Sequence, residues 1–127
     1  MLNVWGKIKE LINRPYIVSQ GETEAGKYTQ WSNGLMICSG KRERTITMNS
    51  TSGSLFSGII TGVQFPKVFT EIPDVVVNSA GTQDYHYASA YGMIVENTQI
   101  KAITFVRTNS SASANVKFNY IAIGKWK

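Results

Sequence analysis

The side chains in this chain that are best suited to chemistry stand together in the stretch GTQDYHYASAY. Four of them follow one another directly: Asp84, Tyr85, His86 and Tyr87. Tyrosine rings stack on the apolar faces of sugar rings, while carboxylate and imidazole groups make directional hydrogen bonds to hydroxyls. These residues therefore predict a carbohydrate-binding loop. In the competing interpretation Tyr87 and Tyr91 pack in the core or against another subunit, and Tyr85 and His86 only close a turn.

Catalysis at this stretch would need more than its single histidine. His86 is the only histidine of the chain, so sites built from several histidines are excluded. A catalytic triad would place His86 beside Ser79, Ser89 or Cys38, with Asp84 as the orienting acid. No nucleophile elbow surrounds any serine of the sequence, and a solitary histidine makes no constellation. We expect a protein that is not an enzyme.

The remaining reactive residue types suggest neither a metal site nor a cofactor. Glu71 and Asp74 flank Pro73 in an expected turn, where solvated acids are the usual finding, whereas glycosidases hold two carboxylates across a cleft. Cys38 is the only cysteine, so the chain forms no internal disulfide and no thiolate metal site. We expect Cys38 to be a small buried apolar side chain.

Length and charge fit one domain with a moderately basic surface. The chain has 127 residues and a formal net charge of +5, with 13 basic and 8 acidic residues. This charge favours anionic partners. The basic residues are scattered without interleaved aromatics, so we expect no nucleic-acid partner. No apolar stretch approaches the ~20 residues that cross a bilayer, and no secretion signal is visible, so we expect synthesis in the cytoplasm without a signal peptide and no membrane insertion.

The N-terminal segment, residues 1–15, predicts a short amphipathic helix that ends before Pro15. Its apolar stripe consists of residues at helical spacing: Val4, Trp5, Ile8, Leu11 and Ile12. So short a helix is marginal alone, and its stripe must rest on the core of its own domain or on the same helix of neighbouring subunits. We expect the second arrangement, an oligomer interface. The polar, glycine-containing segment 16–27 predicts a linker.

Residues 28–127 alternate between apolar and polar side chains in short runs separated by turn residues, which is typical of strands. Asn33 and Gly34 predict a hairpin over about 28–39. The last run places alternate apolar side chains on one face: Val116, Phe118, Tyr120 and Ala122. Arg42 and Arg44 are expected in a solvated turn, with anion capture as the alternative. The pattern predicts an all-β fold, an antiparallel β-sandwich preceded by a short N-terminal α-helix.

Two prolines mark a corner between strands. Proline lacks a backbone donor, so it is confined to strand starts, edges and turns. Pro66 and Pro73 therefore predict a corner in which Val68, Phe69 and Ile72 pack against the core.

The body of the chain resembles known families in three stretches: FPKVFTEIPDVVV, YGMIVENTQIKAITFV and VKFNYIAIG. These are similar to the pattern of H-type lectins. Together with the preceding hairpin they also resemble the C-terminal domains of tailed-phage fibres, spikes and receptor-binding proteins. The resemblance covers roughly residues 27–127 and implies a virion tail protein that forms a homotrimer. It also implies binding to a host cell-surface glycan or wall polymer and contact with other tail proteins. A purely structural tail or virion component without a sugar site is the alternative.

Overall fold

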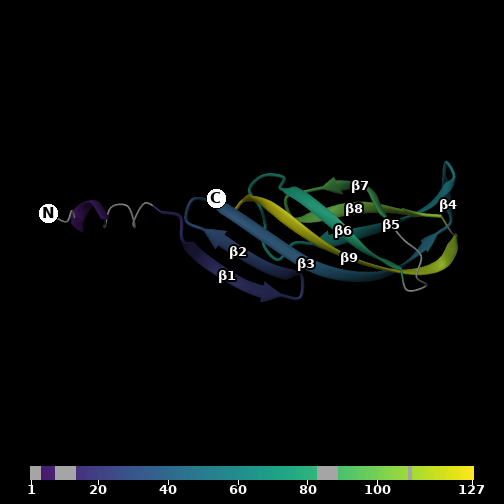
Figure 1. Ribbon diagram of the computed structural model, residues 1–127, viewed down its shortest axis with the longest axis horizontal. Coiled ribbons are helices and arrows are strands. Elements are labelled where there is room, and N and C mark those ends of the chain that lie inside the picture. The colour runs from purple at the N-terminus through teal and green to yellow at the C-terminus, as the bar shows by residue number, and fades with distance from the viewer. Residues whose placement is uncertain (1–3, 8–13, 83–88, 109) are drawn as a thin grey trace.

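Two antiparallel sheets stacked on one another make up the body of the protein. The computed structural model describes residues 4–7, 14–82, 89–108 and 110–127. The strands are β1 (Ile17–Thr23), β2 (Gly26–Trp31), β3 (Leu35–Met48), β4 (Ser50–Ser52), β5 (Leu55–Gln64), β6 (Asp74–Thr82), β7 (Ser89–Val95), β8 (Gln99–Arg107) and β9 (Ser111–Lys125). One sheet has the order β1-β2-β3-β9-β6 and the other β4-β5-β8-β7, and both extend along the long axis of the molecule (Figure 1). The predicted all-β antiparallel sandwich is confirmed.

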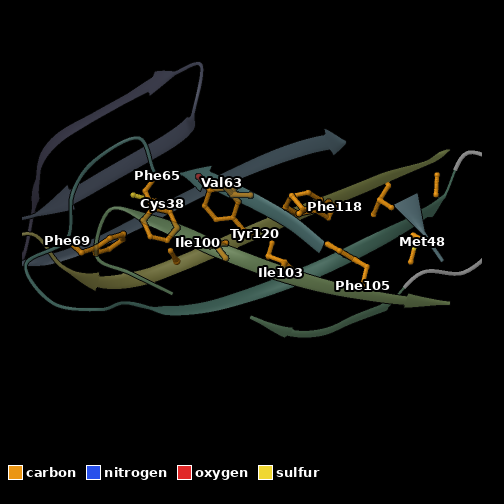
Figure 2. Close-up of a cluster of buried hydrophobic side chains, with 14 of the residues drawn as sticks. Cys38, Met48, Val63, Phe65, Phe69, Ile100, Ile103, Phe105, Phe118 and Tyr120 are labelled. Carbon is orange, nitrogen blue, oxygen red and sulfur yellow. The ribbon is translucent and has the colours of Figure 1, made fainter. Parts of the chain in front are cut away.

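The core lies between the two sheets and is filled by alternate residues of their central strands (Figure 2). On β9 every second side chain is buried, as the alternation predicted: Ala114, Val116, Phe118, Tyr120 and Ala122. The facing sheet contributes buried side chains from β5 and β8, and Phe105 meets Phe118 with 5.5 Å between ring centroids. Cys38 is fully buried among them, also as predicted.

Gly62 lets β5 change the face that it presents to the core. Ile60 and Val63 are both buried although they stand three residues apart, and so are their partners on β8, Ile103 and Ile100. In a regular strand, residues three apart point to opposite faces. Gly62 has a φ of 69°, a left-handed conformation that is costly for any residue with a Cβ. This glycine therefore allows two apolar pairs to reach the same core.

The predicted hairpin over about 28–39 is confirmed by β2 and β3. Gly34 has a φ of 95° and donates its N–H to the carbonyl of Trp31 at 3.0 Å. The side-chain oxygen of Asn33 accepts from the N–H of Leu35 at 3.1 Å. The Asn-Gly pair thus supplies both the backbone conformation and the polar partner that the turn needs.

The linker prediction for residues 16–27 is wrong, because residues 17–23 form strand β1, which pairs with β2 from Thr23 opposite Gly26 to Ile17 opposite Trp31. β1 is the outer strand of its sheet, with exposed or half-buried side chains. An edge strand held by backbone hydrogen bonds needs no apolar face, so its polar sequence resembles a linker.

The N-terminal segment is helical at residues 4–7, apart from the sandwich (Figure 1). Val4 and Trp5 are 55% and 67% exposed. Ile8, Leu11 and Ile12 lie outside the described residues, so the full helix stays a prediction. No helix among the residues that the structure describes is long and apolar enough to cross a membrane.

The corner between Pro66 and Pro73 connects β5 of one sheet to β6 of the other, as predicted. Phe69 is fully buried, meets Phe65 edge-on at 5.4 Å, and donates its N–H to the Asn97 carbonyl at 3.0 Å.

The prediction that Val68 and Ile72 pack against the core is wrong, because their side chains are 59% and 68% exposed. Between the two prolines only Phe69 is buried, and its ring packs against Phe65. The chain on either side of it therefore leaves its apolar residues at the surface.

The role of Gly62 can be tested by comparing Gly62→Ala with Gly92→Ala. An added Cβ meets nothing within 4 Å at either site, so only the positive φ of Gly62 separates them. We expect Gly62→Ala to lower the free energy of unfolding by about 1–2 kcal/mol and Gly92→Ala to change it by less than about 0.5 kcal/mol. Urea unfolding measures both, and equal losses would contradict the face-switch explanation.

Candidate functional site

The residues predicted to bind carbohydrate lie outside the part of the chain that the structure describes: Asp84, Tyr85, His86 and Tyr87. The strands that flank them are described. β6 ends at Thr82, opposite Val116 near the start of β9, and β7 begins at Ser89, opposite Val106 near the end of β8. Both strand ends therefore lie at one end of the sandwich, which we call the distal end.

Two further turns lie at the distal end, because Met48 at the end of β3 pairs with Ser111 at the start of β9. The Thr47 hydroxyl donates to the Ala112 carbonyl at 3.0 Å and ties the turns together. Their exposed residues are small, and nearly all are hydroxyl or amide residues: Asn49, Ser50, Thr51, Gly53, Ser54, Thr108, Ser110, Ala112 and Ser113. Such an uncharged rim can exchange hydrogen bonds with the hydroxyls of a saccharide.

Both ends of the described chain leave the sandwich at the opposite end, near the β2–β3 turn (Figure 1). The Ser32 N–H donates to the Tyr16 carbonyl at 2.8 Å, and the Trp126 indole donates to the Trp31 carbonyl at 2.8 Å. The distal turns are therefore separated from the termini by the length of the sheets.

The basic residues around Arg42 do not form the expected turn, because they lie within β3, a strand of 14 residues. β2 pairs with β3 only as far as Ser39, opposite Lys27, so β3 continues beyond its neighbour. The Arg42 guanidinium donates to the carbonyl of Ala25 and, at 3.3 Å, to that of Gln64. Arg42 thus joins the β1–β2 turn to the end of β5 in the other sheet.

Tyr120 completes this junction from β9. Its hydroxyl donates to the Ala25 carbonyl at 3.0 Å, and the Arg42 guanidinium lies 5.8 Å from its ring centroid. Glycines allow the close approach: a Cβ on Gly26 would stand 2.2 Å from the Ser39 carbonyl oxygen, and one on Gly40 2.8 Å from the Tyr120 ring. The sequence offered no signal for this junction, since its members are 95 residues apart.

Burial changes the titration of two groups here. It raises the pKa of Tyr120 from 10.0 to about 12, an effect that the charge of Arg42 partly offsets. Burial also raises the pKa of Cys38 from 9.0 to about 11, partly offset by a hydrogen bond from the Lys67 backbone. Cys38 is therefore a protonated thiol near neutral pH and not a nucleophile. No group of three potential metal ligands occurs among the described residues.

No protein-family model matches the chain, and no curated protein matches it. Two solved structures have a similar fold. An N-truncated R1-type pyocin tail fibre has 13% identity and a TM-score of 0.56, with 98% of each chain covered. A longer C-terminal part of the P. aeruginosa R1 pyocin fibre has 11% identity and a TM-score of 0.51, with 98% of this chain and 32% of that chain covered. At these identities the likeness shows the fold alone.

The Tyr120 junction predicts a pH-dependent effect of Tyr120→Phe. Near neutral pH the variant loses the hydroxyl bond to Ala25 and about 1 kcal/mol of stability. Because the folded pKa of Tyr120 is raised, its stabilisation is complete below pH 10.0 and is lost as pH rises to about 12. Phenylalanine does not titrate, so the gap between wild type and variant should shrink or reverse over that range. Urea unfolding under reducing conditions measures it, with the exposed Tyr16→Phe as control. A gap independent of pH would contradict the prediction.

Proposed function

We propose that this chain is a receptor-binding domain of a phage tail fibre or a related tail particle, and that it binds bacterial surface carbohydrate without enzymatic activity. The observation that carries the proposal is the fold shared with the R1-type pyocin tail fibre over 98% of both chains. The protein is then a virion tail component that contacts other tail proteins. A structural component without a sugar site is the alternative.

The position of the chain ends supports a distal binding surface. Tyr16 and Trp126 are both bonded to the β2–β3 turn, at the end of the sandwich that is remote from the hydroxyl-rich turns. A domain attached to a fibre by either end would present those turns outward. The predicted residues Asp84, Tyr85, His86 and Tyr87 join β6 to β7 between strand ends on this distal side.

We expect a homotrimer, and exposed apolar residues support association. β6 and β7 are the outer strands of their sheets on the same side of the sandwich, and they expose Val76, Met93 and Ile94 by 68%, 39% and 59%. Long apolar edge strands usually need a cover, and β4, the other edge strand of the four-stranded sheet, has only three residues. Three joined copies would bind a repeating surface polymer more tightly than one, because linked sites act at a high effective concentration.

The double variant Tyr85→Ala/His86→Ala tests the carbohydrate-binding loop. We expect it to abolish binding to those strains, within a panel of differing surface polysaccharides, that wild type binds, while the melting temperature stays nearly unchanged. Flow cytometry with labelled protein measures the binding, and Tyr16→Ala, an exposed tyrosine at the other end, is the control. A large fall in melting temperature would show that these residues pack the fold. Wild type that binds no strain but enters particles would favour the structural alternative.

Deletion of residues 1–14 tests the role of the N-terminal segment in assembly. The exposed side chains of Val4 and Trp5 offer apolar area to a neighbouring subunit. We expect the truncated protein to dissociate at higher concentrations than the full chain, as measured by light scattering over a dilution series. An unchanged trimer would rule out this role, and an unchanged monomer would rule out the trimer itself.

A further inference from the structure

A compact group of polar side chains lies on the outer face of the five-stranded sheet, near the middle of β3 and β9. Lys41 stands opposite Asn119 in the β3–β9 register, and Glu43 stands opposite Lys117. Phe118 and its alternate neighbours on β9 point into the core, so Lys117 and Asn119 point outward. We call Lys41, Glu43, Lys117 and Asn119 the polar array.

The polar array lines a hollow in the surface. All four residues border a hollow of about 610 Å³, which adjoins a second one of about 500 Å³ beside the β1–β2 turn. Lys41, Arg42 and Asn119 line both. The hollows follow from the lengths of the strands, since β2 leaves β3 after Ser39 while β3 and β9 continue together. A ligand that enters here meets two neighbouring strands along several residues.

The register of β3 and β9 fixes how far apart the charged side chains of the array stand. Directly opposed side chains on antiparallel strands are about 5 Å apart at Cβ, and diagonal ones about 7–8 Å. The two lysines occupy one diagonal, and Glu43 and Asn119 occupy the other. An anionic group between the lysines would therefore have a carboxylate and an amide beside it, which can accept from or donate to neighbouring hydroxyls. A sugar unit that carries an acidic group combines these two requirements.

Arg42 points away from the polar array, because it stands opposite the buried Phe118 in the β3–β9 register. Its guanidinium is held on the inner face by the carbonyls of Ala25 and Gln64. On the outer face the lining of the larger hollow therefore has two cations, Lys41 and Lys117, and the single carboxylate of Glu43. The net charge of this lining favours an anionic ligand over a neutral one.

Protection of a sheet edge does not account for the array. Charged residues on β3 blunt the edge that β2 leaves uncovered, and such edges commonly carry lysine. β9, however, has β3 on one side and β6 on the other, so Lys117 and Asn119 protect no edge. Farther along the same face β9 exposes apolar Ile121 and Ile123, by 45% and 43%. On this face the polar residues therefore give way to apolar ones toward the chain ends.

We propose that the polar array is a second saccharide subsite, which binds a sugar unit bearing a carboxylate or phosphate group. This rests on the proposed function, because it names the class of surface polymer that the domain takes. Lys41 and Lys117 hold the anionic group, and Asn119 and Glu43 contact neighbouring hydroxyls. Asn119 is itself positioned by Asn78 of β6, whose amide donates to it at 3.3 Å.

Titration calorimetry on the full chain tests the subsite with three probes. These are an oligogalacturonate for the carboxylate, a glycerol phosphate oligomer for the phosphodiester, and a neutral dextran oligomer. We expect one or both anionic probes to bind more tightly than dextran and to bind more weakly as salt is added. The tighter anionic probe identifies the acidic group. Wild type that binds neither anionic probe, or that binds dextran equally well, would overturn the proposal.

Matched variants show whether the array does the binding. Lys41→Gln/Lys117→Gln should weaken the anionic probe about tenfold. The control Lys101→Gln/Lys125→Gln removes the same charge from exposed positions elsewhere and should have little effect. Glu43→Gln removes a like charge and should tighten binding about twofold. Equal losses in both double variants, no loss in either, or weaker binding by Glu43→Gln would overturn the proposal.

The same variants on bacterial strains separate this subsite from the proposed function. If wild type binds cells and the array variant binds cells and probes equally well, the subsite fails and the proposed function stands. If wild type binds the anionic probe through the array but binds no strain, the proposed function fails and the subsite stands.

Discussion

The position of β9 between β3 and β6 is the constraint on which the rest of the protein depends. β9 pairs with β3 from Ser111 to Lys125 and with β6 from Val116 to Ile123. Because its register is set on both sides, one alternation of its side chains decides what the sheet presents inward and outward. The inward series ends at Tyr120 and Ala122 in the core, and a slip of one residue would exchange the buried ring for an asparagine. The core and the outer polar array are therefore two consequences of one register.

Glycines at three positions let segments approach the core and the central strand more closely than other residues could. Gly62 changes the phase of β5, so that Ile60 and Val63 both reach the core. Gly26 and Gly40 let the β1–β2 turn approach close enough for the Ala25 carbonyl to accept from both Arg42 and Tyr120. In each case a side chain at the glycine would either strain the backbone or clash with neighbouring atoms. Local backbone freedom thus permits long-range contacts that the regular strands could not make.

The parts of the fold that the sequence predicts well are those with a local cause. The hairpin at Asn33 and Gly34 follows from the conformation that these residues favour, and the alternation at the end of the chain follows from burial on one face. The sequence does not reveal β1, because an edge strand needs only backbone partners. It places Arg42 in a turn, because a cluster of charged residues is typical of turns as well as of exposed strands. The phase change at Gly62 and the polar array depend on which residues of other strands stand opposite, and a single sequence does not contain that register. The predicted binding loop at Asp84 to Tyr87 stays a prediction, since it lies outside the described residues.

The two proposed binding regions differ in how the fold constrains them, and this difference bears on what each can recognise. The described distal turns connect strand ends and consist mainly of exposed residues, so their sequence can change at little cost to stability. Lys117 and Asn119 instead alternate with Phe118 on the most constrained strand, and their spacing cannot change without moving the core. A fixed array suits a feature that recurs in a polymer, such as a regularly placed acidic group. Variable turns suit the features that distinguish one polymer from another. Under the two proposals, the face of the β-sandwich provides a constant contact while its tip selects the surface.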